Sequence, residues 1–249
     1  MNFNKTLIRS SSVGYLMTEP VTKADKEAGI LSKTAKSHLI EIYIREKYGR
    51  TKDVQTKQMR KGIEVEEEAI DLLGEFLGRK LGKNTERFTN DFITGHPDVL
   101  DLTEAGLKVW DVKSSYDLFT FLGNIPDKLN SQYYWQLQSY MWLTGATESC
   151  IAYCLLNTPF GIIEQEKNSL LYRMADAVTN ESPKYVLEAA KLELNMMFDD
   201  IDQKERLLLF PVQRNDEDIE LIKDKVSKAR VFLESIEETH LNFNNGKGI

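Results

Sequence analysis

The stretch "GHPDVLDLTEAGLKVWDVKSS" (residues 95–115) contains two short apolar runs on either side of a polar turn, and each run carries an aspartate. Strand side chains alternate, so Asp111 and Lys113 share one face of the second run. If residues 103–106 form a hairpin loop, Asp98 lies opposite Asp111 on the antiparallel ladder. Carboxylates paired in this way repel each other unless a cation or a shared proton compensates. The stretch predicts a strand hairpin with a metal site, provided that the register does not slip by one residue.

The preceding residues, 56–78, have the apolar periodicity of a helix, and an acid completes the apolar stripe. Glu66 fits this stripe by three- and four-residue steps. The stripe consists of Ile63, Ala69, Ile70, Leu73, Phe76 and Leu77. Neighbouring acids such as Glu64 fall on the opposite, solvated side. A buried glutamate is costly unless it is paired, protonated or bound to a cation, so we expect Glu66 either to bind a cation or to pair with a lysine.

A further helix is predicted over residues 131–145, "SQYYWQLQSYMWLTG". Gln136 and Tyr140 are four residues apart and lie on one face of it, together with Tyr133 and Leu137. Taken alone, this polar pair is either a structural hydrogen bond or part of a site.

In this order, Glu66, Pro97-Asp98, Asp111-Val112-Lys113 and Gln136-x-x-x-Tyr140 resemble the motifs of the PD-(D/E)XK nuclease superfamily. The segments "GIEVEEEA", "GHPDVLD", "WDVKSS" and "YWQLQSYMWLTG" are more closely similar to the lambda-exonuclease and YqaJ-type viral recombination exonucleases, over about residues 62–145. The resemblance implies a restriction-endonuclease-like α/β fold, in which helices flank a central mixed β-sheet and further helices are added at both ends.

The same resemblance implies roles for individual residues. The two aspartates would bind one or two Mg²⁺ or Mn²⁺ ions, with help from Glu66 and from a backbone carbonyl. Lys113 would orient or deprotonate the attacking water and offset charge in the transition state. The polar pair of residues 131–145 would position Lys113, the water or the DNA strand. The implied catalytic residues are Glu66, Asp98, Asp111, Lys113, Gln136 and Tyr140, and the implied metal ligands are Glu66, Asp98, Asp111 and Val112.

The activity that this family implies is 5'-3' digestion of double-stranded DNA, which leaves 3' single-stranded tails for recombination. In this group a basic residue and a hydroxyl near the first helix hold the 5' phosphate, and "IRSSS" offers Arg9 with Ser10, Ser11 or Ser12. A ring-shaped homo-oligomer and a single-strand annealing partner are also implied. Two alternatives stay open: an endonuclease with the same chemistry, and a catalytically silent DNA-binding homologue.

Composition limits the remaining classes. The chain has a net charge of −7, yet residues 1–61 carry 13 Lys and Arg against 6 Asp and Glu. Its two cysteines, Cys150 and Cys154, are too few for the four-cysteine iron–sulfur cluster of some related nucleases. No phosphate-binding loop motif of ATPases appears, so we expect no nucleotide cofactor. Without a signal peptide or a long apolar run, the protein is expected in the cytoplasm of a bacterium or phage-infected host, with no membrane contact.

The chain contains no internal repeat or low-complexity linker, which favours a single nuclease domain over residues 1–249. Within it we expect a basic N-terminal helical region (1–61), a catalytic core (62–156), and a C-terminal strand with helices (157–249).

Overall fold

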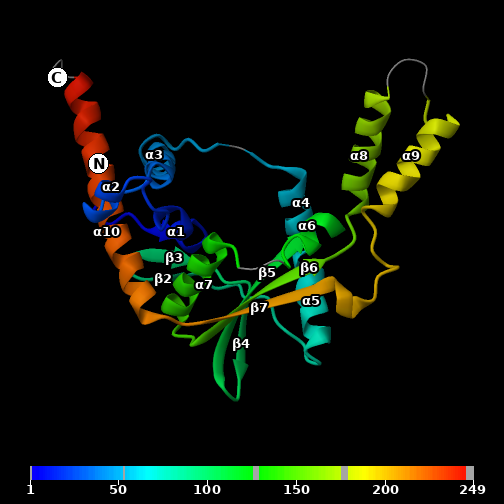
Figure 1. Ribbon diagram of the computed structural model, residues 1–249, viewed down its shortest axis with the longest axis horizontal. Helices are drawn as coiled ribbons and strands as arrows, with labels where there is room; N and C mark the ends of the chain where they lie inside the picture. The colour runs from blue at the N-terminus through cyan, green and yellow to red at the C-terminus, as the bar shows by residue number, and fades with distance from the viewer. Residues whose placement is uncertain (1, 53, 126–128, 175–178, 245–249) are drawn as a thin grey trace.

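The computed structural model describes residues 2–52, 54–125, 129–174 and 179–244 (Figure 1). It contains a mixed four-stranded sheet in the order β4-β5-β6-β7, in which β5 and β6 are parallel and the outer pairs are antiparallel. The strands are β4 (Val99–Thr103), β5 (Gly106–Ser115), β6 (Glu148–Leu155) and β7 (Leu207–Gln213). The predicted α/β class with a mixed sheet is confirmed.

A second, three-stranded sheet in the order β1-β3-β2 was not predicted. Its strands are β1 (Ile8–Arg9), β2 (Phe88–Thr89) and β3 (Ile93–Gly95). Strands of two or three residues are too short to show a period-2 pattern, and they form here through tertiary packing.

Helices cover both faces of the four-stranded sheet (Figure 1). They are α1 (Ser10–Leu16), α2 (Lys23–Glu27), α3 (Lys33–Tyr48), α4 (Lys57–Glu64), α5 (Glu66–Phe76), α6 (Leu118–Leu122), α7 (Ser131–Thr144), α8 (Phe160–Arg173), α9 (Pro183–Leu194) and α10 (Asp216–Asn244), with a 3₁₀ turn at Gln203–Arg206. Helix α5 packs with Trp110 and Val112 on one face. On the other face α6 and α7 pack with Val109 and Ile151. Within the described residues, no helix is long and apolar enough to cross a membrane.

Two groups of helices rise from the ends of the sheet (Figure 1). On one side, α1, α3 and α10 enclose a separate apolar core that includes Val13, Leu39 and Val226. On the other side stand α4, α8 and α9, and the chain between α3 and α4 crosses from one group to the other. The four-stranded sheet therefore lies between two helical groups.

The predicted single helix over residues 56–78 is wrong, because it divides at Val65. Val65 has φ −105° and ψ 12°, which ends α4 and begins α5 with a different rotational phase. The buried side of α5 consequently consists of Val65, Ala69, Ile70, Leu72 and Leu73. Two members of the predicted stripe are exposed instead, Ile63 by 64% and Phe76 by 50%.

Close packing of α1 against α7 supplies a test of the fold. A Cβ atom at Gly14 would lie 2.7 Å from the Cα atom of Gln132. We expect Gly14→Ala to cost about 1–3 kcal/mol of the free energy of unfolding, since the two backbones would have to move apart. Gly161→Ala in α8 is the matched control, because nothing lies within 4 Å of its Cβ position. Equal denaturation midpoints for the two variants would contradict this packing.

Candidate active site

The β4–β5 hairpin brings the two sequence-predicted aspartates together. Val99 pairs with Trp110, and one further step along the ladder places Asp98 opposite Asp111. The register agrees with the prediction, although the turn is tighter, because Thr103 pairs with Gly106. Asp98 lies just before β4 and its Oδ2 accepts a hydrogen bond of 2.7 Å from the backbone N–H of Val112.

Asp111 is the most deeply buried acid of the site, with 1% of its surface exposed. Its Oδ1 accepts a hydrogen bond of 2.9 Å from Nε2 of Gln136, and its Oδ2 lies 2.5 Å from Nζ of Lys113. The two carboxylate oxygens thus have different partners, one an amide from α7 and one an ammonium from the same strand.

The polar pair of α7 connects the acid to the loop before β4. Nε2 of Gln136 also donates to the hydroxyl of Tyr140 at 2.9 Å, and that hydroxyl donates to the carbonyl of His96 at 3.2 Å. These bonds link helix α7, the base of β4 and Asp111 into one network. They fix the position of the buried carboxylate.

The electrostatics of the pair match those of a cation site. Burial first, and then the charge of Asp111, raise the pKa of Asp98 to about 7. Burial lowers the pKa of Lys113, but the charges of Asp111 and Asp98 offset this effect and hold that pKa above its ordinary value. Lys113 is therefore an ammonium ion at neutral pH in the metal-free protein. In that state it donates hydrogen bonds and positive charge, and it cannot accept a proton.

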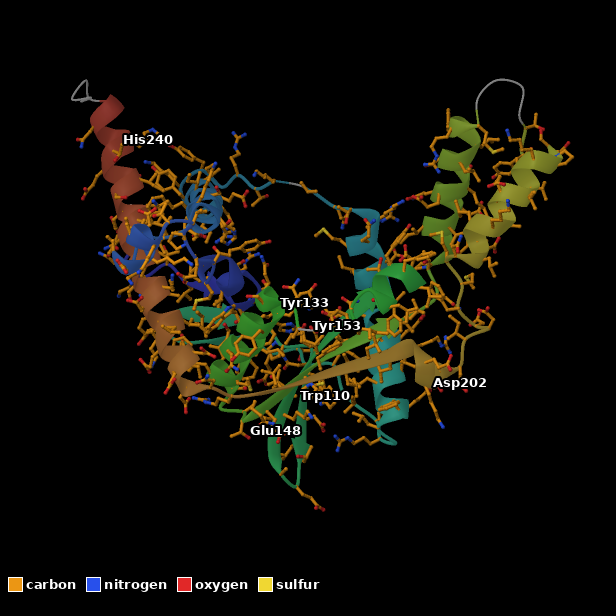
Figure 2. All side chains as sticks on the ribbon, in the orientation of Figure 1. Trp110, Tyr133, Glu148, Tyr153, Asp202 and His240 are labelled. Atoms are coloured by element: carbon orange, nitrogen blue, oxygen red, sulfur yellow. The ribbon has the colours of Figure 1, made fainter. Side chains whose placement is uncertain are left out.

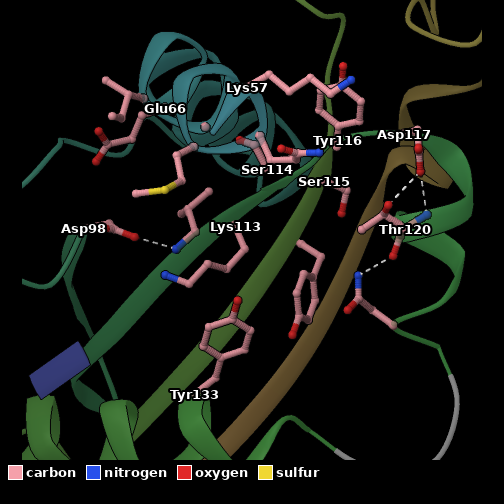
Figure 3. Close-up of a pocket in the computed structure, with 17 residues that line it drawn as sticks. Lys57, Glu66, Asp98, Lys113, Ser114, Ser115, Tyr116, Asp117, Thr120 and Tyr133 are labelled. Carbon is pink, nitrogen blue, oxygen red and sulfur yellow. Dashed lines mark hydrogen bonds between the residues drawn. The ribbon is translucent and has the colours of Figure 1, made fainter. Parts of the chain in front are cut away.

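A cavity of about 730 Å³ opens beside these groups (Figure 3). Glu66, Asp98, Val112 and Lys113 all line it. The helix from which Glu66 projects, the Asp98 loop and strand β5 meet at this cavity (Figure 3).

Glu66 is not buried as predicted. It is the first residue of α5, its side chain is 29% exposed, and its Oε2 accepts a hydrogen bond of 2.9 Å from Nζ of Lys83. The break at Val65 moves it away from the buried stripe to the rim of the cavity. The predicted pairing of Glu66 with a lysine is thus present, and the partner is Lys83.

The residues fit a divalent cation in part. Among the described residues, no three carboxylate, imidazole or thiol groups lie close enough together to hold a metal. The carboxylates of Asp98 and Asp111 nevertheless offer hard oxygen ligands. A bound cation would compensate the repulsion between their charges. Oδ2 of Asp111 is buried, and the partner that it has among the described residues is the Lys113 ammonium of its ion pair. The acid pair is thus suited to bind a metal beside Val112, which lines the same cavity, whereas Glu66 would first have to leave Lys83.

The N-terminal residues lie outside this cavity. Arg9 is exposed at the start of α1 and lines a second cavity together with Lys5 and Arg45. Ser10 is buried and its hydroxyl donates to the carbonyl of Thr94 at 3.3 Å, while Ser11 is exposed and Ser12 is half-buried.

The sequence missed several residues that line the catalytic cavity. Lys57, Tyr116 and Tyr153 are brought there by α4, by the end of β5 and by β6. Tyr133 had been placed on the face of Gln136 but had no assigned role. Tyr153 stands beside Lys113 through the parallel pairing of β5 with β6, which no local pattern predicts.

Comparison with solved structures places the chain in a family. A phage-related exonuclease from Haemophilus somnus 129PT is 30% identical and matches 94% of this chain and 96% of its own, with a TM-score of 0.73. The chain belongs to the lambda-exonuclease/YqaJ-type family. This membership makes it a nuclease of the exonuclease class.

A second exonuclease has a similar fold but little sequence identity with the protein described here. An alkaline exonuclease from Laribacter hongkongensis is 15% identical over 98% of this chain and 95% of its own, with a TM-score of 0.62. Its complex with dAMP has also been solved. Neither a protein-family model nor a curated protein matches the sequence.

The raised pKa of Asp98 leads to a pH prediction for the metal-free protein. A carboxyl group whose pKa is about 7 when folded and about 4 when unfolded keeps its proton longer in the folded state. Its stabilising contribution is complete below about pH 4 and is lost as the pH rises through 7. In EDTA, we expect the Tm of the wild type to fall across this range more steeply than that of Asp98→Asn. Parallel slopes in thermal unfolding would contradict the assignment.

Proposed function

We propose that the protein is a divalent-metal-dependent 5'-3' exonuclease that acts on double-stranded DNA and leaves 3' single-stranded tails for recombination. The observation that carries the proposal is the pairing of Asp98 with Asp111 beside the Lys113 ammonium at one open cavity. Membership of an exonuclease family supports the same reaction class.

The proposed cofactor is Mg²⁺ or Mn²⁺, held by Asp98, Asp111 and the Val112 carbonyl, with Glu66 as a further ligand. When bound, such an ion polarises the phosphate and lowers the pKa of its water. The acid pair would supply the hard oxygen ligands that these ions prefer. No iron–sulfur cluster or nucleotide cofactor belongs to the proposal.

The protein's own groups would act on the phosphodiester from several sides. Lys113 would place positive charge beside a non-bridging oxygen, where negative charge builds up in the transition state. Gln136 would hold Asp111 in position through its 2.9 Å hydrogen bond. Tyr140 would tie Gln136 to the His96 carbonyl, so that the loop carrying Asp98 keeps its distance from β5.

The DNA path is proposed to use the excess of basic residues in positions 1–61. Phosphate contacts by lysine and arginine give affinity without reading sequence. Arg9, with one of Ser10, Ser11 and Ser12, is the proposed grip for the 5' phosphate, supported by the cations that gather with Arg9 at the second cavity. A ring-shaped homo-oligomer, a single-strand annealing partner and a location in the cytoplasm of a bacterium or phage-infected host complete the proposal.

The test is incubation with linear duplex DNA and with covalently closed circular DNA, in Mg²⁺ or in EDTA. We expect the linear DNA to be degraded only with Mg²⁺, faster when its 5' end is phosphorylated, and the closed circle to stay intact. Cleavage of the circle would favour the endonuclease alternative. DNA binding without any cleavage would favour the silent homologue.

Glu66 and Glu64 form a matched pair of variants. Glu66 lines the catalytic cavity, whereas Glu64 is 44% exposed beside Arg60 and does not line it. We expect Glu66→Ala to lower the cleavage rate by about ten- to a hundredfold, as the loss of one ligand or of a hydrogen bond in the transition state would. Glu64→Ala should cleave at the wild-type rate. Equal rates for both variants would remove Glu66 from the site.

A further inference from the structure

Tyr133 of α7 and Tyr153 of β6 lie close together at the centre of the molecule (Figure 2). Both line the catalytic cavity together with Lys113. Their rings meet edge to face, with centroids 6.2 Å apart and planes inclined by 62°. Tyr153 pairs in register with Lys113 on the neighbouring parallel strand, so both side chains lie on one face of the sheet. Nζ of Lys113 is 5.3 Å from the centroid of the Tyr133 ring. Two phenol groups and an ammonium thus enclose one part of the cavity.

The hydroxyls of these two tyrosines are unused within the described part of the chain. Neither makes a hydrogen bond there, and neither is a buried atom cut off from solvent. Elsewhere the tyrosine hydroxyls of the core are paired: that of Tyr134 donates to Asp218 at 2.5 Å and that of Tyr140 to His96. Buried tyrosines ordinarily find such a partner. The two free hydroxyls are therefore donors available to a ligand in the cavity.

Three other polar groups of the cavity already have protein partners. Asp117 accepts from both the backbone N–H and the hydroxyl of Thr120 at 2.7 Å. Lys57 pairs with Glu166 at 2.7 Å. Asn124 donates to the carbonyl of Thr120 at 2.8 Å. The side chains of Gln58, Ser114 and Ser115 also line the cavity and make no hydrogen bond within the described residues. Tyr133 and Tyr153 differ from them in their position, because the first lies 5.3 Å from Nζ of Lys113 and the second pairs with Lys113 in register.

We propose that Tyr133 and Tyr153 form a phosphate subsite, in which their hydroxyls donate hydrogen bonds to non-bridging phosphate oxygens of the substrate strand. The inference rests on the proposed function, because it takes DNA as the ligand. Neutral donors beside an ammonium bind an anion through charge-assisted hydrogen bonds, which are stronger than neutral ones. The subsite is also rigid, since Tyr153 is 6% exposed and its ring packs at 90° against that of Phe210. Such preorganised donors cost little entropy when the strand binds.

The first experiment removes each hydroxyl and keeps each ring. We expect Tyr133→Phe and Tyr153→Phe each to lower kcat/KM on linear duplex DNA about ten- to a hundredfold, the usual effect of losing a hydrogen bond to a charged group. The Tm and the pH profile of cleavage should not change, because the ring contact with Lys113 remains. Tyr172→Phe in α8, where the side chain is 90% exposed, is the matched control and should leave kcat/KM unchanged.

The second experiment identifies the phosphate. A single methylphosphonate replaces one charged oxygen by a methyl group, at the first, second or third linkage from the 5' end. Binding is measured with Ca²⁺, and the wild type is compared with the double Phe variant. At one linkage, we expect the methylphosphonate to weaken binding of the DNA to the wild type. At the same linkage it should not change the affinity of the double Phe variant, which already lacks both hydroxyls. This linkage shows whether the subsite holds the cleaved phosphate or a neighbour.

The two proposals fail in different ways. The subsite would be overturned if the methylphosphonate and the double Phe substitution weakened binding additively at every linkage. It would also be overturned if the single Phe variants had the wild-type kcat/KM. In both cases the wild type would still degrade DNA. A wild type that leaves linear duplex DNA intact in Mg²⁺ would overturn the proposed function itself.

Discussion

Replacing Asp111 with asparagine is expected to lower the rate of DNA cleavage by about a thousandfold or more. Asparagine keeps the shape of the side chain and the oxygen that accepts from Gln136 at 2.9 Å. It removes the negative charge that repels Asp98 and neutralises Lys113. Without this charge a divalent ion loses a ligand, and losses of this order follow when a group that stabilises the transition state is removed. Single-turnover cleavage of a labelled linear duplex measures the effect.

Asp101→Asn is the matched control for that variant. Asp101 lies on the same hairpin and is also buried, but it faces α5, where it accepts from the indole N–H of Trp110 at 3.1 Å and pairs with Arg79. We expect it to cost stability and to leave the cleavage rate unchanged, at a temperature where both variants are folded. If the two variants lost cleavage equally, burial of charge in the hairpin would explain the loss, and Asp111 would have no catalytic role.

Lys113→Met should lower cleavage by about a hundredfold or more while DNA binding persists. Methionine keeps much of the aliphatic stem and removes the ammonium that lies 2.5 Å from Asp111. The transition state then loses a positive charge at close range in a partly buried site, where such charges have large effects. The excess negative charge of the acid pair should meanwhile raise the affinity for Mg²⁺. Cleavage rates measure the loss of activity, and filter binding measures the DNA binding that should persist.

Lys108→Met on the same strand tests whether loss of any lysine from β5 lowers cleavage. Lys108 lies on the opposite face of β5, with Nζ 4.6 Å from the Trp110 ring and 3.9 Å from Glu148. The Lys108→Met variant should therefore cleave DNA at the wild-type rate. A loss shared by both lysine variants would point to general weakening of DNA binding and would contradict a specific role for Lys113.

The sequence predicted the centre of the site because strand geometry is local. Alternation fixes which face Asp111 and Lys113 share, and a tight turn fixes which residue lies opposite. Both features are carried by residues 95–115, and the pairing of Val99 with Trp110 agrees with them. The spacing of Gln136 and Tyr140 likewise predicted one helical face, and their hydrogen bond joins them on it.

Features that depend on distant contacts were not predictable in this way. The position of Glu66 was wrong because the apolar pattern does not reveal the break at Val65, which packs with Trp110 in the core beneath the sheet. Helices were expected over residues 157–249, but the bounds of α8 within them were not predictable, because only Ile162 and Ile163 of it are buried, too few for a clear helical stripe. Tyr153 reached the site through a parallel pairing that joins residues far apart in the sequence.

Binding of Mn²⁺ to the protein without DNA tests the central claim most directly. Titration calorimetry, or the loss of the free-ion signal in electron paramagnetic resonance, measures it independently of cleavage. We predict that the wild type and Asp101→Asn bind Mn²⁺ with equal affinity, and that Asp111→Asn has lost this binding. Absence of binding to the wild type, or equal binding to Asp111→Asn, would contradict a metal centre built on Asp98 and Asp111.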